Sequence, residues 1–291
     1  MTLHQKKAEL YRLNFEFFVR QGIHCETQDT LLVLTNDVKS KYQDQIDELH
    51  DECHSRFGNF VQLIARNNTC LDMDSPRVAV EYAGRGERPA VMANPNTTIG
   101  PNTVAYYDYF VYINCGVTGP SPLWAERGWT GVFLRELRDG VKMTGLSINC
   151  QIPESPHVQS MMYAMDREGL QTVVDGGALY DCTKNSDPFG LNNTSPYLTI
   201  ILSYEVKMSE LILQAGYGIS SIVRPTTLFP HNISSCIDKD NQPLQHIWYA
   251  HRLTDYFGRI PSLDEVGFFK TSRQLPPDIA EVINYTVDVP W

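Results

Sequence analysis

Three polar segments of the sequence carry side chains that could bind a nucleotide or move a proton. The first begins at Arg66 and contains Asp72 and Asp74, whose Asp-x-Asp spacing could also hold a metal ion. A guanidinium group suits a phosphate, and a carboxylate suits a ribose hydroxyl or a base. The segment enters the N-terminus of an expected helix, which favours an anion. We therefore predict that Arg66, Asp72 and Asp74 hold the nucleotide. The alternative is a capped loop whose aspartates only suit the helix dipole.

The second segment follows a run of β-forming residues, 104–113, and begins with Asn114, Cys115 and Gly116. In an open parallel sheet, ligands bind beyond the carboxyl ends of the strands. A buried strand that ends in a polar loop with glycine therefore predicts contacts from Asn114, Cys115 and Gly116 to the diphosphate of a bound donor. The alternative is an ordinary strand followed by a turn.

The third set of residues could move a proton or contact an acceptor. Glu205 stands at the start of an expected helix, and we predict that it is the general base that deprotonates an acceptor hydroxyl. Asp181 is the second candidate for this role, and His157 is expected to contact the sugar or the acceptor. Each has a plainer alternative: a carboxylate that suits a helix dipole, a solvated loop aspartate and a structural histidine.

The elements that would position these residues alternate between helices and strands. Helical spacing of apolar residues predicts helices over 5–20, 46–57, 129–137, 158–165 and 208–215, and apolar runs predict strands at 31–35, 60–65, 104–114 and 142–150. This alternation predicts an α/β fold with a mostly parallel sheet and helices on both faces. We expect a nucleotide-binding domain over residues 1–230 and a C-terminal appendage on it over 231–291.

Composition narrows the possible partners and locations. The formal net charge is −10, without a basic run, which disfavours nucleic acid as a partner. The sequence has no signal peptide and no apolar run of membrane-spanning length. Its seven cysteines include no CxxC pair. These features predict neither a disulfide framework nor a structural zinc site, and they favour a reducing compartment, the cytoplasm.

Short motifs recur in a fixed order over nearly the whole chain. They are Asn14-Phe15-Glu16-Phe17-Phe18 before Gly22, the loop from Arg66 to Asp72, Tyr107-Asp108-Tyr109 through Asn114, Gly119-Pro120, residues 142–150, His157-Val158-Gln159-Ser160, Glu205-Val206 with Met208-Ser209 and Gly216-Tyr217, and residues 265–270. In this order they resemble a family of glycosyltransferase-like proteins related to rhamnan synthesis protein F, found in bacteria, algae and chlorovirus-type giant viruses.

The resemblance implies a GT-A-like fold, a Rossmann-type sheet that binds a nucleotide-sugar. We expect transfer of the sugar from this donor, with a UDP-sugar favoured, to a saccharide acceptor in glycan synthesis, with inversion of configuration. The sequence departs from the family pattern where it has Cys70 in place of a glycine, and where it has Asn114-Cys115-Gly116 in place of the usual Asp-x-Asp. Dependence on a divalent metal, manganese or magnesium, therefore stays open. Few residues precede the first helix, so either the chain is a fragment or its sheet has a shortened edge.

Two other functions compete with transfer. A transferase fold that has lost its metal motif could be a non-catalytic module that binds a carbohydrate or a nucleotide, and the missing Asp-x-Asp favours this alternative. A glycoside hydrolase would need two facing carboxylates, and the sequence identifies no such pair. P-loop, dinucleotide-binding and serine-hydrolase motifs are also absent from the sequence.

Overall fold

The computed structural model describes residues 3–25, 30–35, 42–57, 60–65, 74–83, 108–150, 155–192, 195–223, 259–271 and 276–283. The chain divides into two compact units. Unit 1 comprises residues 1–22, 108–176 and 204–291, and unit 2 comprises residues 23–107 and 177–203. The predicted domain boundary between residues 230 and 231 lies outside the described residues.

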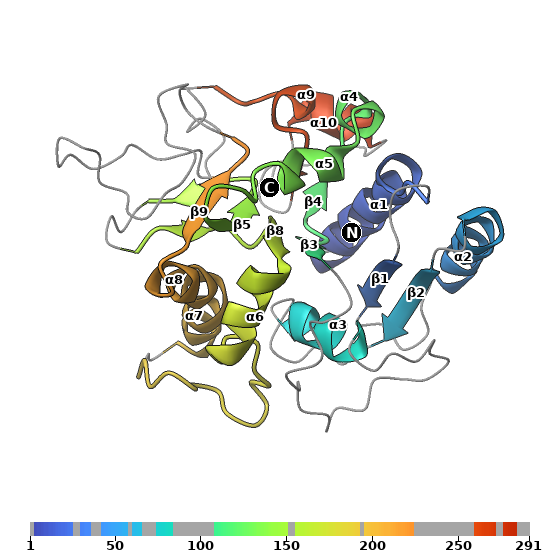
Figure 1. Cartoon of the computed structure of the whole chain (residues 1–291). Coiled ribbons are helices and arrows are strands. Elements are labelled where there is room, and N and C mark those ends of the chain that lie inside the picture. Colours follow the sequence, from blue (N-terminus) through green and yellow to red (C-terminus); the bar gives the residue numbers. More distant parts are fainter. Residues whose placement is uncertain are drawn as a thin grey trace. The chain divides into compact units, whose positions relative to one another are not determined.

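Unit 1 contains a mixed four-stranded sheet and several helices (Figure 1). Its helices are α1 (Leu3–Gly22), α4 (Pro122–Glu126), α5 (Trp129–Leu134), α6 (Arg167–Asp175), α8 (Lys207–Gln214), α9 (Leu263–Val266) and α10 (Pro277–Val282). Its strands are β3 (Tyr109–Ile113), β4 (Val117–Thr118), β5 (Val141–Gly145), β6 (Ile148–Asn149), β7 (His157–Val158), β8 (Met162–Asp166), β9 (Gly218–Ser221) and β10 (Phe269–Lys270).

The four-stranded sheet has the order β3-β8-β5-β9. Strand β8 is antiparallel to both β3 and β5, and β5 is parallel to β9. The α/β class is thus correct, but the prediction of a mostly parallel sheet was wrong. The chain returns from β5 to β8 through the β6–β7 hairpin, and a return of this kind reverses direction without the crossover helix that a parallel pair needs.

The helix predicted over 158–165 was also wrong, because these residues lie in β7, β8 and the turn between them. The segment contains three methionines and one alanine, residue types that favour helices in isolation. In the fold it runs through the middle of the sheet, where Met162 and Ala164 are fully buried. A short apolar run cannot be assigned to a strand or a helix by periodicity alone, and the partners of β8 decide its conformation.

Helices cover both faces of this sheet, as predicted. Ala164 of β8 belongs to the main apolar cluster of unit 1 together with Phe133 of α5. Its neighbour Met165 pairs in register with Met143, whose sulfur accepts a hydrogen bond from Ser209 of α8 at 3.7 Å. Since successive side chains of a strand point to opposite faces, α5 packs on one face and α8 on the other.

The C-terminal end of α1 packs against the apolar cluster of unit 1 and is hydrogen-bonded to it. The indole nitrogen of Trp129 donates to the carbonyl oxygen of Gly22 at 2.7 Å. A Cβ atom at Gly22 would lie 2.5 Å from the ring of Phe18 and 2.8 Å from Pro120. Gly22 is therefore required for close packing at the point where α1 ends.

Unit 2 contains the parallel pair β1 (Thr30–Thr35) and β2 (Phe60–Ala65), joined through α2 (Gln43–Phe57). Both strands and the helix lie where the sequence predicts them. The unit also contains α3 (Ser75–Ala83) and α7 (Pro196–Ile201). A π-helical segment, η2 (Leu202–Val206), follows α7 directly and leads into α8 along the chain.

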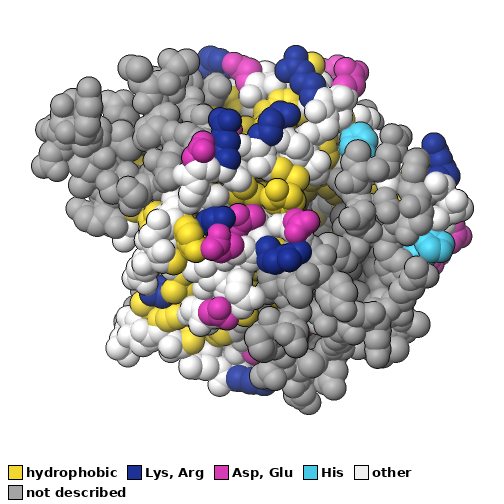
Figure 2. Space-filling model, in the orientation of Figure 1, with side chains coloured by type: hydrophobic (Ala, Val, Ile, Leu, Met, Phe, Trp, Pro, Cys, Tyr) yellow, Lys and Arg dark blue, Asp and Glu magenta, His cyan; other side chains and the backbone are white. Residues whose placement is uncertain are grey.

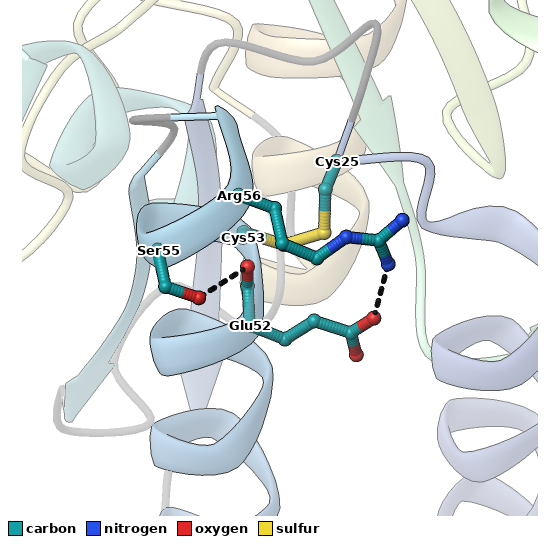
Figure 3. The surroundings of a disulfide bond; sticks show 5 residues. All are labelled: Cys25, Glu52, Cys53, Ser55 and Arg56. Carbon is teal, nitrogen blue, oxygen red and sulfur yellow. Dashed lines mark hydrogen bonds and ion pairs between the residues drawn. A yellow bond between two sulfur atoms is a disulfide. The ribbon is translucent and has the colours of Figure 1, made fainter.

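The prediction that the cysteines form no disulfides was wrong. Cys25 and Cys53 are bonded to each other in unit 2, with their Cα atoms 5.0 Å apart (Figure 3). Cys150 and Cys182 each take part in a disulfide bond, whereas Cys115 is exposed and is not in a disulfide. Cys25 and Cys53 are separated by 28 positions, so no local spacing motif could reveal the pair. The argument for a reducing compartment therefore loses its basis.

In the part of the chain that the structure describes, no helix combines the length and apolar character needed to span a membrane.

Candidate functional site

The predicted site residues fall into three groups. Arg66 and Asp72 lie outside the described residues. Asp74 and Asp181 belong to unit 2. The remaining candidates all belong to unit 1: Asn114, Cys115, Gly116, His157 and Glu205. The candidate site is therefore built from the residues of unit 1.

Three strands of the unit 1 sheet end at the same edge. Ile113 of β3 is opposite Met162 at the start of β8, and Gly145 at the end of β5 is opposite Tyr163. Gly145 is also in register with Ser221 at the end of β9. We call this side of the sheet, with residues 114–116 and 157–161, the carboxyl edge. In α/β sheets, ligands bind at such an edge.

The turn after β3 is held by hydrogen bonds within itself and to β8. The Asn114 side-chain oxygen accepts from the Gly116 N–H at 2.7 Å, and the Val117 N–H donates to the Asn114 carbonyl oxygen at 3.1 Å. The Asn114 N–H donates to the carbonyl oxygen of Met161 at 3.0 Å. Asn114 is thus fixed beside the start of β8, because its partner Met161 is the residue that follows Ser160.

Two buried residues far from this turn in sequence hold its backbone carbonyl groups. The Asn14 side-chain amide in α1 donates to the Cys115 carbonyl oxygen at 3.0 Å and to the Thr271 hydroxyl at 2.8 Å. The Thr271 N–H donates to the Gly116 carbonyl oxygen at 2.9 Å. Asn14 and Thr271 are both buried. Asn14 is the first residue of the Asn-x-x-Phe-Phe motif. The motif therefore includes a residue that supports the turn, a role that its residue type alone does not indicate.

Glu205 is held at the carboxyl edge by a hydroxyl group. The Ser160 hydroxyl donates to Oε2 of Glu205 at 2.8 Å, and Oε1 has no hydrogen-bond partner among the described residues. Glu205 lies in the π-helical segment η2, and single π-helical turns are frequent at functional sites. The carboxylate is partly exposed, so it combines a fixed position with access to solvent.

A second contact fixes the helix that carries Glu205. The Val158 N–H donates to the Ser209 hydroxyl oxygen at 3.0 Å, and that hydroxyl donates to the sulfur of Met143. Ser209 is four residues after Glu205, so both side chains lie on one face of a helix. The helix is thereby attached to the strand segment at Val158 and again at Ser160.

His157 lies in β7, opposite Asn149, and is buried. Its Nδ1 atom is 3.2 Å from the carbonyl oxygen of Ser155. With the proton on Nδ1, the ring donates to that carbonyl and its Nε2 atom can accept a hydrogen bond. His157 is three residues before Ser160 in the same segment, which brings it to the same edge of the sheet.

Asp74 is engaged by an arginine in unit 2. Its two oxygens accept from Nε and Nη2 of Arg77 at 2.5 and 3.0 Å, and Nη1 of Arg77 donates to Glu81 at 2.6 Å. All three side chains are buried. Burial lowers the pKa of Arg77, but hydrogen bonds and charge attraction from Asp74 and Glu81 outweigh this effect and raise the pKa above its usual value. This geometry matches the structural interpretation of Asp74 better than a ligand-binding one.

Asp181 accepts hydrogen bonds from its own loop in unit 2. Its Oδ1 atom accepts from the N–H and the hydroxyl of Thr183 at 3.0 and 2.5 Å, and Oδ2 lies 3.5 Å from the Lys184 ammonium. Burial raises the pKa of Asp181, but the Thr183 hydrogen bonds, with smaller effects from Arg77 and Lys184, lower the pKa overall. An ionised loop carboxylate is the simpler interpretation of this residue.

The turn at Asn114–Gly116 does not fit a magnesium or manganese ion. These hard cations prefer several oxygen ligands. The side chains of the turn offer one amide oxygen, already bonded to Gly116, and one thiol, and its backbone carbonyl oxygens accept the hydrogen bonds described above. Within the described residues, no group of three or more His, Cys, Asp or Glu side chains could hold a metal. A metal site that uses Asp72 would involve residues outside the described ranges.

No family model, curated protein or solved structure matches this chain. The chemistry of the site is therefore argued from its geometry. One turn that follows a strand and one carboxylate held by a hydroxyl meet at the carboxyl edge of the sheet, with a histidine on the same segment.

Proposed function

We propose that this chain is a glycosyltransferase with a GT-A-like fold, which transfers a sugar with inversion from a nucleotide-sugar, preferably a UDP-sugar, to a glycan acceptor. One observation carries the proposal: Asn114 and Glu205 each bond to one of two consecutive residues at the carboxyl edge. Asn114 bonds to Met161, and Ser160, the residue before Met161, bonds to Glu205. Asn114 and Glu205 lie far apart in the sequence, and this segment links them.

The described residues support a direct displacement. The acceptor hydroxyl oxygen forms a bond to the anomeric carbon while the bond from that carbon to the diphosphate oxygen breaks. Glu205 takes the hydroxyl proton, and the diphosphate leaves with the electron pair. The turn at Asn114–Gly116 contacts the diphosphate, His157 contacts the sugar or the acceptor, and Arg66 with Asp72 holds the nucleotide. The side chains of the described turn do not suit a divalent metal, and a metal held at Asp72 would use residues outside the described ranges.

A cytoplasmic location was expected because the cysteines were predicted to form no disulfide framework. The Cys25–Cys53 disulfide removes this reason, and no compartment is proposed. Disulfides of this kind persist in oxidising compartments and are rare in the cytosol.

The second candidate function is a binding module without catalysis. The turn at Asn114–Gly116 favours it, because this turn lacks the carboxylates with which a transferase usually holds its metal. Such a module would bind a nucleotide or a sugar at the same edge and would release it unchanged.

A panel of donors separates these functions. The protein is screened for thermal stabilisation by UDP-, GDP- and dTDP-sugars with and without manganese, and the released nucleotide is then measured in the presence of glycan acceptors. A transferase is stabilised by one class of donor and releases its nucleotide only with an acceptor. Stabilisation without release would show a binding module. Cleavage of a glycoside without any nucleotide would show a hydrolase, and would overturn the proposal.

A further inference from the structure

We propose that Ser160 is the positioning residue of Glu205. Its hydroxyl binds Oε2 of the carboxylate and leaves Oε1 to take the proton of the acceptor. The inference rests on the proposed transferase function, because it assigns a purpose to the position in which Glu205 is held.

The backbone around Ser160 is fixed on both sides. Before it, the Gln159 N–H donates to the Ser147 carbonyl oxygen at 3.0 Å. After it, the Met161 carbonyl oxygen accepts from the Asn114 N–H at 3.0 Å. Ser160 itself is buried, with 7% of its surface exposed. Its hydroxyl therefore extends from a rigid position between β7 and β8.

The helix that carries Glu205 is also fixed in register with this segment. Glu205 and Ser209 are four residues apart, and their partners Ser160 and Val158 are two residues apart. Both hydrogen bonds are present together, so the Ser209 contact holds the segment that carries Glu205 against the segment that carries Ser160.

A hydroxyl is suited to this role because it is an uncharged donor. It restricts the rotation of the carboxylate without forming an ion pair with it. Among the described residues, no cationic side chain forms an ion pair or a hydrogen bond with Glu205. Among these residues no cation therefore competes with the acceptor hydroxyl for this carboxylate, and its position is set by Ser160.

The direct test of this hydrogen bond does not need a substrate. The protein is labelled with 13C at the side-chain carboxyl carbon (Cδ) of glutamate, and the Cδ resonance of Glu205 is identified by its loss in Glu205→Gln. Ser160→Ala should move this resonance to the position of a solvated carboxylate, and Ser160→Thr should leave it near its wild-type position. Ser147→Ala is the matched control, because it removes a buried hydroxyl that bonds to Gln159 and not to Glu205. An unmoved resonance in Ser160→Ala would overturn the proposal.

Kinetic measurements test whether the position of the Glu205 carboxylate, as set by Ser160, affects the rate of transfer. Ser160→Ala should lower kcat about 10- to 100-fold with KM within about twofold, since displacement of a reacting group by about 1 Å has effects of this size. Ser160→Thr should restore most of the rate. If Ser147→Ala and Ser160→Ala lowered kcat equally, and Ser160→Thr gave no rescue, Ser160 would have only a structural role. Absence of turnover in the wild-type protein would overturn the proposed function, and the resonance of Glu205 would then decide the hydrogen bond on its own.

Discussion

The two edges of the unit 1 sheet hold their carboxylates in different ways. At the edge opposite the carboxyl edge, where β3, β5 and β9 begin and β8 ends, the carboxylates are paired with cations. Lys142 lies 2.8 Å from Asp166 and 2.6 Å from Glu168, and Arg167 lies 2.7 Å from Asp108. We call this side the opposite edge.

At the carboxyl edge, by contrast, Glu205 is held by the neutral hydroxyl of Ser160. An ion pair uses the charge of a carboxylate to hold the fold together, whereas a single hydroxyl leaves that charge available. On the face drawn in Figure 2, Lys and Arg side chains lie beside Asp and Glu side chains among the described residues. The ion pairs of Lys142 with Asp166 and Glu168 at the opposite edge are of this kind. At the two ends of one set of strands, carboxylates are thus either paired with cations or held by an uncharged hydroxyl.

The largest expected effect tests this division directly. Glu205→Gln should lower the transfer rate about 100-fold or more, because loss of a general base typically costs this much. Glu168→Gln at the opposite edge should leave the rate within about threefold, since Glu168 is paired with Lys142 and Tyr217. The measurement is nucleotide release with donor and acceptor, with circular dichroism as the check on folding. Near-normal transfer in folded Glu205→Gln would show that Glu205 is not the base.

Asp166→Ala should have the next largest effect, on stability. Asp166 pairs with Lys142 and also caps α6 by accepting from the Gly169 N–H at 2.8 Å. We expect a loss of about 2 kcal/mol in the free energy of unfolding, with about 1 from the cap and about 1 from the partly buried ion pair. Asp166→Asn keeps the cap and should lose about half as much. Equal losses in the two variants, measured by urea unfolding, would mean that the cap contributes little.

The pH dependence of stability should reveal the charges of the opposite edge. Burial lowers the pKa of Lys142, but the hydrogen bonds that it donates to Asp166 and Glu168 raise its pKa overall. Hydrogen bonds from Lys142 and Tyr217 lower the pKa of Glu168. The Lys142 contribution is full below its unfolded pKa of about 10.4 and is lost as pH rises through the folded pKa. The Glu168 contribution is present above its unfolded pKa of about 4.3 and is lost as pH falls through the folded pKa.

The difference in melting temperature between the wild type and Lys142→Met should therefore be largest near neutral pH and should narrow both below about pH 4 and above about pH 10.5. Differential scanning calorimetry at several pH values measures it. A difference that did not change between neutral and acidic pH would contradict the role of Glu168.

The smallest expected effect concerns Cys115, the exposed thiol in the turn at the carboxyl edge. If the diphosphate of a donor lies at this turn, a saturating nucleotide should slow alkylation of Cys115 about threefold or more, by mass action on the unbound form. A cysteine introduced at the opposite edge as Asp108→Cys, where the aspartate side chain is 78% exposed, supplies the control. Peptide mass spectrometry gives both rates. Equal protection of the two cysteines would mean that the nucleotide does not bind selectively at the carboxyl edge.

Elements defined by local patterns were predicted well from the sequence. The apolar spacing of residues 5–20 corresponds to α1, the runs at 31–35 and 60–65 to β1 and β2, and residues 208–215 to α8. Their patterns arise from one buried face or one buried strand, so they are visible within ten to twenty positions. The π-helical turn at Glu205 was not predicted, because nothing in its sequence distinguishes it from the helix that follows.

Contacts between distant residues could not be predicted in the same way. The antiparallel direction of β8 depends on a hairpin return, and the disulfide of Cys25 and Cys53 joins positions without any spacing motif. The hydrogen bond of Ser160 to Glu205 joins residues 45 positions apart. A candidate base could be proposed from residue type, but its partner could not.

The sequence by itself determined the α/β class, the main helices and strands, and the residue types that could bind a diphosphate or take a proton. Local burial and backbone preferences act over a few residues and leave a readable pattern. Only the tertiary structure decided which carboxylates pair with cations and that Glu205 accepts a hydrogen bond from the Ser160 hydroxyl. The function of a carboxylate depends on the groups within a few ångströms of it, and at both edges of this sheet those groups come from other parts of the chain.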